Sequence, residues 1–133
     1  MLFRSSHLAA YGRVDIALDT FPYHGTTTTC EALWMGVPVV TLAGEIHASR
    51  VGVSLLTSAG LPGLVANTED EFLRIAADLA ADPPRLAELR ANLRGRMSRS
   101  LLMDAPRYAR QVEAAFRGMW RQWCAQPGGT GTR

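Results

Sequence analysis

The chain has 133 residues, 47% hydrophobic and 20% charged, which fits one soluble globular domain and is short for a complete two-substrate enzyme. Its formal net charge of +2 is too small to indicate nucleic-acid binding, and its longest uncharged apolar stretch, 37–44, is too short to span a membrane. No N-terminal segment has the residue order of a signal peptide, so we expect a cytoplasmic protein that binds neither nucleic acid nor membrane.

The basic and sulfur-containing residues carry little specific chemistry. All 14 basic residues are arginine, so this chain supplies no lysine to a phosphate. The arginines concentrate between Arg85 and Arg121 at helical spacing, which is typical of a solvated helix face. Cys30 and Cys124 lie far apart and form no metal or redox motif, so we expect both to be reduced.

Taken in chain order, short apolar runs alternate with amphipathic segments. A short helix over 8–11 precedes a buried strand over 14–18, and a Pro/Gly loop follows. A helix over 26–35 ends at Gly36, and a second strand covers 37–42. Further along we expect a helix over 48–59, a weak strand over 64–66, a helix to 81 capped by Asn67 or Thr68, helices over 84–99 and 105–123, and a disordered tail over 126–133.

This alternation predicts a partial Rossmann-like α/β fold, with a parallel sheet and right-handed crossovers. Only about three strands are expected, whereas a doubly wound nucleotide-binding domain has about six. The sheet would therefore have an open edge, which indicates a fragment or a chain that has a partner.

The segment 25–29, Gly-Thr-Thr-Thr-Thr, follows the first strand and opens a helix. Unpaired N–H groups and the helix dipole favour an anion there, and Gly25 lets the backbone approach it closely. The alternative is that Thr26 caps the helix while its neighbours are solvated. Four β-branched residues are poor helix formers, so we favour binding of a diphosphate.

Glu31 lies one turn after Thr27 on the same helix face. Its carboxylate could accept hydrogen bonds from both hydroxyls of a ribose, or it could only stabilise the helix start through the dipole. The sequence leaves these two readings even.

The remaining polar residues near this strand edge are weaker candidates. We expect Asp19 to bind backbone N–H groups of the turn that follows it, and the loop residues His24 and His47 to lie at the surface rather than act as bases. Arg50 could meet a phosphate or pair with Glu45. The tryptophans are expected to pack rather than to stack on a ligand: Trp34, Trp120 and Trp123. No Gly-x-Gly-x-x-Gly, Walker loop, His-Glu-x-x-His or nucleophile elbow is present, which disfavours dinucleotide oxidoreductases and P-loop enzymes.

These motifs resemble those of a known family: the C-terminal catalytic lobe of O-linked N-acetylglucosamine transferases, including bacterial members with tetratricopeptide repeats and SPINDLY-like members. The resemblance covers roughly residues 3–124 and is carried by 11–19, 21–44, 47–56 and Met119-Trp120. It implies the donor-binding lobe of a GT-B glycosyltransferase over 1–124, incomplete upstream, and a disordered tail over 125–133.

The resemblance also implies individual roles in binding a UDP-sugar. His7 matches a histidine that packs against the uracil, Thr27 and Thr28 match residues that cradle the diphosphate, and Glu31 matches an acid that binds the ribose. Gly25 belongs to the same diphosphate segment, and Thr26 stands where animal members carry a histidine. No catalytic residue, metal or cofactor is expected within this chain.

The family's phosphate-binding lysine, its proposed catalytic histidine region and its acceptor-binding lobe match no part of this sequence. The first reading is therefore the UDP-sugar-binding portion of an inverting protein O-glycosyltransferase, with UDP-N-acetylglucosamine as the expected donor, inactive alone. Its protein acceptor would bind through the missing lobe or repeats. The alternative is a non-catalytic nucleotide-binding or interaction module, or a truncated gene remnant.

Overall fold

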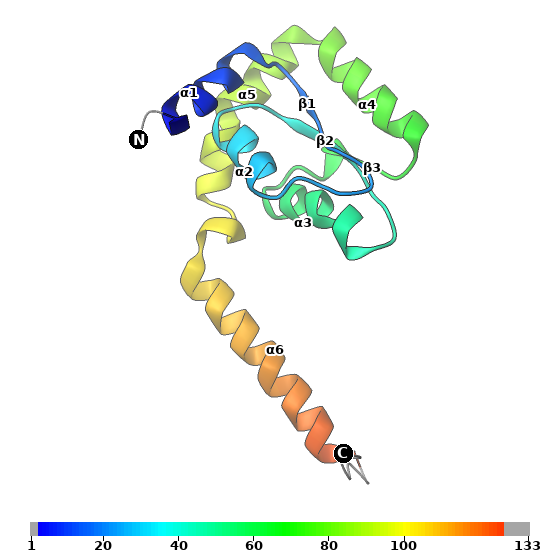
Figure 1. The fold of residues 1–133 in the computed structure, drawn as a ribbon, viewed down its shortest axis with the longest axis vertical. Helices are drawn as coiled ribbons and strands as arrows, with labels where there is room; N and C mark the ends of the chain where they lie inside the picture. Colours follow the sequence, from blue (N-terminus) through cyan, green and yellow to red (C-terminus); the bar gives the residue numbers. More distant parts are fainter. Residues whose placement is uncertain (1–2, 127–133) are drawn as a thin grey trace. The chain divides into compact units, whose positions relative to one another are not determined.

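The computed structural model describes residues 3–126, which fall into two compact units divided between Met103 and Asp104. The first unit is built on a three-stranded parallel sheet in the order β1-β2-β3 (Figure 1). The strands are β1 (Ala17–Leu18), β2 (Val39–Leu42) and β3 (Val65–Ala66). Ala17 lies opposite Val39, and Leu42 opposite Ala66. The predicted parallel α/β sheet is confirmed.

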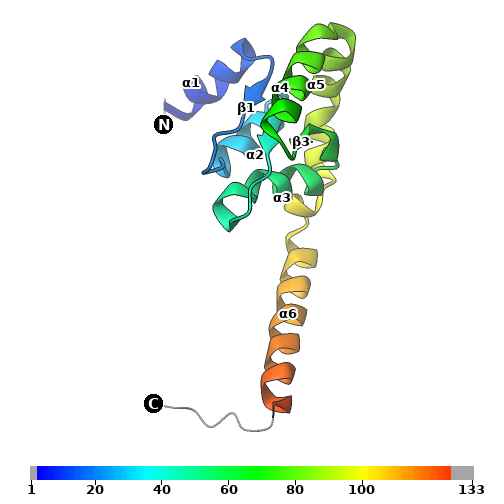
Figure 2. The ribbon, with the colours of Figure 1, turned by 90° about the vertical axis from the view of Figure 1, so that its right-hand side faces the viewer.

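Helices connect and cover the strands. After the N-terminal helix α1 (Phe3–Ala10), α2 (Thr27–Trp34) joins β1 to β2, and α3 (Val51–Ser58) joins β2 to β3. Figure 1 shows α2 and α3 on one side of the strands and α4 (Glu69–Ala81) on the other. The helix α5 (Pro83–Ser98) follows and contacts both α2 and α4 (Figure 2). All three strands therefore end at the same edge, towards the loops that begin at residues 19, 43 and 67.

The helix boundaries follow the expected signals. Thr68 accepts a hydrogen bond from the Glu71 N–H, which confirms it as the N-cap of α4. Asp82 caps α5 in the same way through the Arg85 N–H. Gly36 has a φ of 82°, the left-handed conformation that ends α2 as predicted.

The first strand is shorter than predicted, beginning at Ala17 rather than Val14. The carbonyl groups of Val14 and Asp15 accept hydrogen bonds from the Arg90 guanidinium, at 2.6 and 2.9 Å, instead of pairing with a neighbouring strand. A side chain from α5 thus takes the place of a strand partner.

The hydrophobic core lies between the sheet and the helices of the first unit. Its members are the apolar faces of the helices and the centre of β2, of which Leu33, Leu56 and Leu93 are fully buried. Large aliphatic side chains recur at helical spacing on α2, α3 and α5, so each of these helices turns its apolar face towards the core.

The arginines of α5 are not simply a solvated face, contrary to the sequence expectation. Arg94 Nε donates to the Trp34 carbonyl at the end of α2, and Arg96 donates to the Gly60 carbonyl after α3. Carbonyl groups at helix ends lack partners within their helix, so these guanidinium groups satisfy them.

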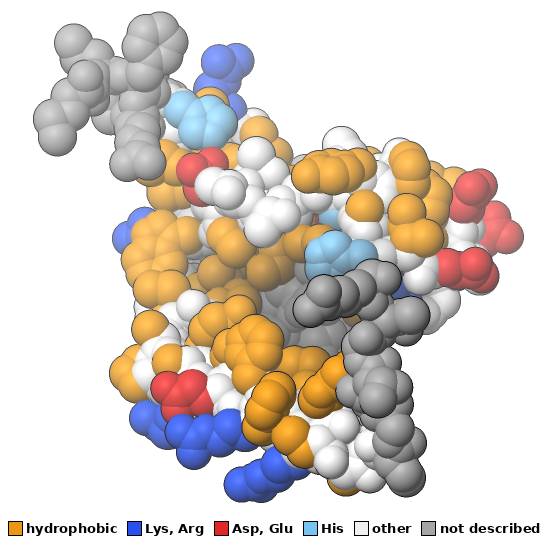
Figure 3. All heavy atoms as spheres, turned by 60° about the horizontal axis from the view of Figure 1, so that its bottom comes forward, with side chains coloured by type: hydrophobic (Ala, Val, Ile, Leu, Met, Phe, Trp, Pro, Cys, Tyr) orange, Lys and Arg blue, Asp and Glu red, His pale blue; other side chains and the backbone are white. Residues whose placement is uncertain are grey.

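The second unit is the helix α6 (Ala105–Ala125), which Asp104 caps through the Arg107 N–H. Its apolar side chains recur at helical spacing and are exposed: Tyr108, Phe116, Met119, Trp120 and Trp123. Exposed hydrophobic side chains cover much of the face shown in Figure 3. Trp120 and Trp123 are 66% and 56% exposed, so the packing expected for them from the sequence is not found within the described residues. The tail from 127 on lies outside the described residues.

Candidate functional site

The four threonines divide into two groups at the start of α2. Thr29 is buried, and its hydroxyl donates to the Gly25 carbonyl at 3.0 Å. Thr26, Thr27 and Thr28 are exposed. Thr26 is the N-cap residue of α2, but its side chain forms no capping hydrogen bond with any described residue. The threonine row therefore offers exposed hydroxyls beside helix N–H groups, as an anion site requires.

Gly25 is required by close packing at this turn. A Cβ atom placed on Gly25 would lie 2.5 Å from Thr28 Oγ1 and 3.0 Å from Thr29 Oγ1, closer than side chains tolerate. A larger residue at this position would push the threonine hydroxyls away from the helix start.

His7 and Glu31 meet beside the threonines. His7 Nε2 lies 3.2 Å from Glu31 Oε2, and the two side chains are 56% and 33% exposed. A pocket of about 370 Å³ opens here, lined by both residues together with Thr27 and several apolar side chains: Leu8, Cys30, Trp34, Met97 and Met103. Three of the residues singled out in the sequence thus line one cavity.

Tyr11 is a member of this cluster that the sequence reasoning passed over. Its ring packs edge-on against His7, with centroids 5.7 Å apart, and its hydroxyl donates to the Thr28 carbonyl at 3.4 Å. Burial and, secondly, the Glu31 carboxylate raise the pKa of Tyr11, so the phenol stays a donor. Its position four residues after His7, on the same helical face, was the available signal.

Cys30 lines the same pocket from α2. Burial, followed by the neighbouring Glu31 carboxylate, raises the pKa of the Cys30 thiol. A thiol held protonated is a poor nucleophile, so the geometry indicates a packing role.

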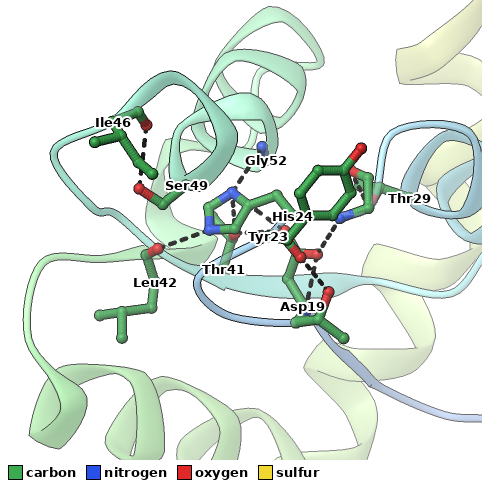
Figure 4. Close-up of polar contacts among 11 residues, drawn as sticks. Asp19, Tyr23, His24, Thr29, Thr41, Leu42, Ile46, Ser49 and Gly52 are labelled. Carbon is green, nitrogen blue, oxygen red and sulfur yellow. Dashed lines mark hydrogen bonds and ion pairs between the residues drawn. The ribbon is translucent and has the colours of Figure 1, made fainter.

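Asp19 binds backbone N–H groups, as predicted. Its Oδ1 accepts from the Gly25 N–H at 2.9 Å and from the Thr20 N–H at 3.1 Å (Figure 4). Its Oδ2 accepts from the Thr41 hydroxyl at 2.6 Å. The carboxylate thereby fastens the turn before α2 to the neighbouring strand β2.

The surface position expected for His24 is wrong. This side chain is fully buried, because it fills the space between the β1–α2 loop, the end of β2 and the start of α3. Loop residues are usually exposed, and nothing in the local sequence indicates this burial.

His47 and Arg50 lie in the loop after β2. His47 is exposed, as expected. Arg50 donates to the Gly44 carbonyl at 3.0 Å, so in this structure it supports its own loop rather than pairing with Glu45. Trp34, expected to pack, is instead partly exposed and stacks against the Arg94 guanidinium, 5.1 Å from the ring centroid.

Among the described residues, no group of three or more histidine, cysteine or acidic side chains is placed to hold a metal ion. No helix over the same range is long and apolar enough to cross a membrane. The expectation that binding needs no metal or cofactor stays a prediction.

The family model described as glycosyl transferase family 41 matches residues 4–112. The chain belongs to this family. Among its relatives is the Oryza sativa subsp. japonica protein named probable UDP-N-acetylglucosamine–peptide N-acetylglucosaminyltransferase SPINDLY, 57% identical over 118 residues, which are 89% of this chain and 13% of that protein. A Caenorhabditis elegans UDP-N-acetylglucosamine–peptide N-acetylglucosaminyltransferase is 36% identical over 120 residues, 90% of this chain and 10% of the relative.

A solved family structure matches the fold. A mutant of the Thermobaculum terrenum O-GlcNAc transferase superposes with a TM-score of 0.80 and 47% identity, over 90% of this chain and 23% of that one. The resemblance to O-linked N-acetylglucosamine transferases and the predicted fold class, the C-terminal lobe of a GT-B glycosyltransferase, are confirmed. This glycosyl transferase family 41 chain spans about an eighth of the plant relatives that it matches.

Proposed function

We propose that this chain is the donor-binding portion of an inverting protein O-glycosyltransferase that uses a UDP-sugar, with UDP-N-acetylglucosamine as the expected donor. The observation that carries the proposal is the single pocket lined by His7, Thr27 and Glu31. Relatives named as UDP-N-acetylglucosamine–peptide N-acetylglucosaminyltransferases support the choice of donor and of a protein acceptor.

The spacing of the pocket residues suits the parts of UDP. One helical turn, about 5.4 Å, separates the level of Glu31 from that of Thr27 on α2. In the proposed pose the ribose hydroxyls bind the Glu31 carboxylate, the diphosphate lies on Thr27 and Thr28, and the uracil packs against His7. Because Glu31 contacts His7 in this structure, the ribose would compete for Glu31 Oε2 or use its other oxygen.

The proposed chemistry is sugar transfer with inversion. A serine or threonine hydroxyl of the acceptor attacks the anomeric carbon, the bond from that carbon to the UDP oxygen breaks, and the hydroxyl proton leaves to a base outside this chain. The N-terminus of α2 would stabilise the negative charge that develops on the departing diphosphate. Rate would also depend on positioning an acceptor that other parts of the protein hold.

The chain alone offers little charge to the diphosphate. A helix N-terminus carries the equivalent of roughly half a positive charge, and this sequence has no lysine. We therefore propose that further cationic groups come from outside these 133 residues, and that the isolated chain binds UDP weakly and transfers no sugar. The expected cytoplasmic location stays a prediction.

Calorimetric titration of the full 133-residue chain with UDP tests the site. We expect saturable binding that Thr27→Ala and Glu31→Ala each weaken by about tenfold, because each removes a charged or polar contact worth about 1–2 kcal/mol. Thr57→Ala, an exposed threonine on α3, is the matched control and should bind as the unchanged chain does.

Titrations with ADP and GDP under the same conditions test the choice of base. Equal binding of all three nucleotides would contradict a uracil pocket at His7. A folded chain that binds no nucleotide at all would contradict the proposed function and favour the truncated-remnant alternative.

A further inference from the structure

His24 lies where three loops at the strand ends meet, and it makes contact with each of them. It belongs to the β1–α2 loop, its Nε2 lies 3.0 Å from the Leu42 carbonyl oxygen at the end of β2, and its Nδ1 lies 3.0 Å from the Gly52 nitrogen near the start of α3 (Figure 4). Its side chain is fully buried, so these contacts are shielded from water.

The hydrogen-bond partners determine the protonation state of the imidazole. The Gly52 N–H can only donate, so His24 Nδ1 must be an unprotonated acceptor. The Leu42 carbonyl can only accept, so His24 Nε2 must carry the proton. The ring is therefore a neutral imidazole whose two nitrogens have opposite and fixed roles.

The neighbouring acid and hydroxyl are committed elsewhere. Thr41 donates its single proton to Asp19 Oδ2 at 2.6 Å, so its 3.4 Å approach to His24 Nδ1 is a polar contact without a proton. Asp19 Oδ2 lies 3.5 Å from the same nitrogen. Asp19 also accepts a hydrogen bond from the N–H of Gly25, the residue that directly precedes the threonines.

The fit around His24 leaves no room for another atom. A Cβ on Gly52 would overlap Asp19 Oδ2 and Thr41 Oγ1, and would lie 3.0 Å from His24 Nδ1. Because Gly52 is the second residue of α3, the histidine also accepts one of the N–H groups that a helix start leaves unpaired.

We propose that His24 is a positioning residue of the donor site. It joins the turn that carries Gly25 and the threonines to β2 and α3, and so holds the start of α2 in the geometry that receives a diphosphate. The inference rests on the proposed function of that helix start, although the hydrogen-bonding roles of the imidazole do not depend on it. Binding sites of this kind gain affinity when their groups are held in place before the ligand arrives.

The first test is spectroscopic and needs no ligand. Nitrogen NMR of the full 133-residue chain, with labelled histidine, should show one of its three histidines as a neutral ring protonated on Nε2, and His24→Gln should remove that signal. A His24 signal from a charged ring, or from the Nδ1-protonated form, would overturn the proposal.

The second test measures nucleotide binding by variants that keep one of the two hydrogen-bonding groups of the imidazole or neither. His24→Asn keeps an acceptor near the Nδ1 position, His24→Gln keeps a donor near the Nε2 position, and His24→Ala keeps neither. We expect UDP affinity to fall about tenfold or more in His24→Ala and by less in the other two, whereas affinity for uridine, which has no phosphate, changes less than twofold. His47→Ala, an exposed histidine of the loop after β2, is the matched control.

A loss of UDP and uridine affinity in equal proportion would overturn the proposal, because it would show a general effect on folding. Unchanged UDP affinity in all three variants would overturn it as well. If His24→Ala does not fold, His24→Asn and His24→Gln test the proposal by the same comparison, the loss of UDP affinity against the loss of uridine affinity. If the unchanged chain binds no UDP, the proposed function fails, and the positioning role of His24 is then tested by hydrogen exchange of the Gly25 amide in these variants. Faster exchange than in His47→Ala supports the positioning role, and equal exchange contradicts it.

Discussion

At the scale of single residues, the carboxylate of Glu31 is the common neighbour of His7, Tyr11 and Cys30. It contacts His7 directly, and it contributes to the raised pKa values of Tyr11 and Cys30. In the proposed pose the Glu31 carboxylate is the acceptor for the ribose hydroxyls, because a carboxylate has two acceptor oxygens and each hydroxyl can donate.

Alkylation of the two cysteines tests the electrostatics of this pocket. The raised pKa keeps Cys30 protonated at pH values at which an ordinary thiol ionises, so iodoacetamide should modify it several-fold more slowly than the exposed Cys124. Raising the pH should accelerate the modification of Cys30 only above the range in which an ordinary thiol ionises. Peptide mass spectrometry over time measures both rates in one sample; equal rates at every pH would contradict this account. Bound UDP should slow Cys30 alone.

At the scale of secondary-structure elements, arginine side chains of α5 donate hydrogen bonds to backbone carbonyl groups of neighbouring segments. Arg90, Arg94 and Arg96 each donate to carbonyl groups that precede a strand or follow a helix. Arginine suits this task because its planar guanidinium presents several donors in fixed directions. These arginines thus serve tertiary structure, and the expectation that the chain binds no nucleic acid stays a prediction.

Arg94→Ala should lower the free energy of unfolding by about 1–2 kcal/mol, since it removes a helix-end hydrogen bond and the stacking on Trp34. Arg94→Lys should fall in between, because it keeps the charge without the planar fork. Urea denaturation followed by circular dichroism measures the three chains. Arg85→Ala, an exposed arginine on the same helix, should stay within about 0.5 kcal/mol of the unchanged chain; a similar loss there would contradict a specific role for Arg94.

At the scale of the whole molecule, the proposed donor site takes its polar residues from α1 and α2, and its lining also includes Met97 and Met103. No catalytic base is assigned to any described residue. The segment that matches this chain makes up only 10–14% of the length of its relatives.

The isolated 133-residue chain should therefore show no sugar transfer. Incubation with radiolabelled UDP-N-acetylglucosamine and a serine-containing acceptor peptide should leave the peptide unlabelled, and free UDP should not accumulate above the rate without protein. The full-length Caenorhabditis elegans relative, which is named for this activity, serves as the positive control. Turnover by this chain alone would contradict the division of roles proposed here.

Much of the fold was predictable because its signals are local. Apolar runs alternating with amphipathic segments predict the parallel sheet, Thr68 caps α4, and Gly36 ends α2, as expected. Three residues that the sequence singled out, His7, Thr27 and Glu31, line one pocket, while anion binding at the four threonines stays a prediction. Family membership, indicated by motifs over most of the chain, is confirmed by the comparisons.

The tertiary structure alone decided the positions that depend on distant contacts. The sequence by itself determined most of the helices and strands and the helix start that carries the threonines, because capping, turns and periodicity are set by near neighbours. The pairing of His7 with Glu31 and the contact of Arg90 with Val14 join residues 24 and 76 positions apart. The buried His24 meets Leu42 and Gly52, which lie 18 and 28 positions further along the chain. Such contacts leave no local pattern, so only the folded chain reveals them.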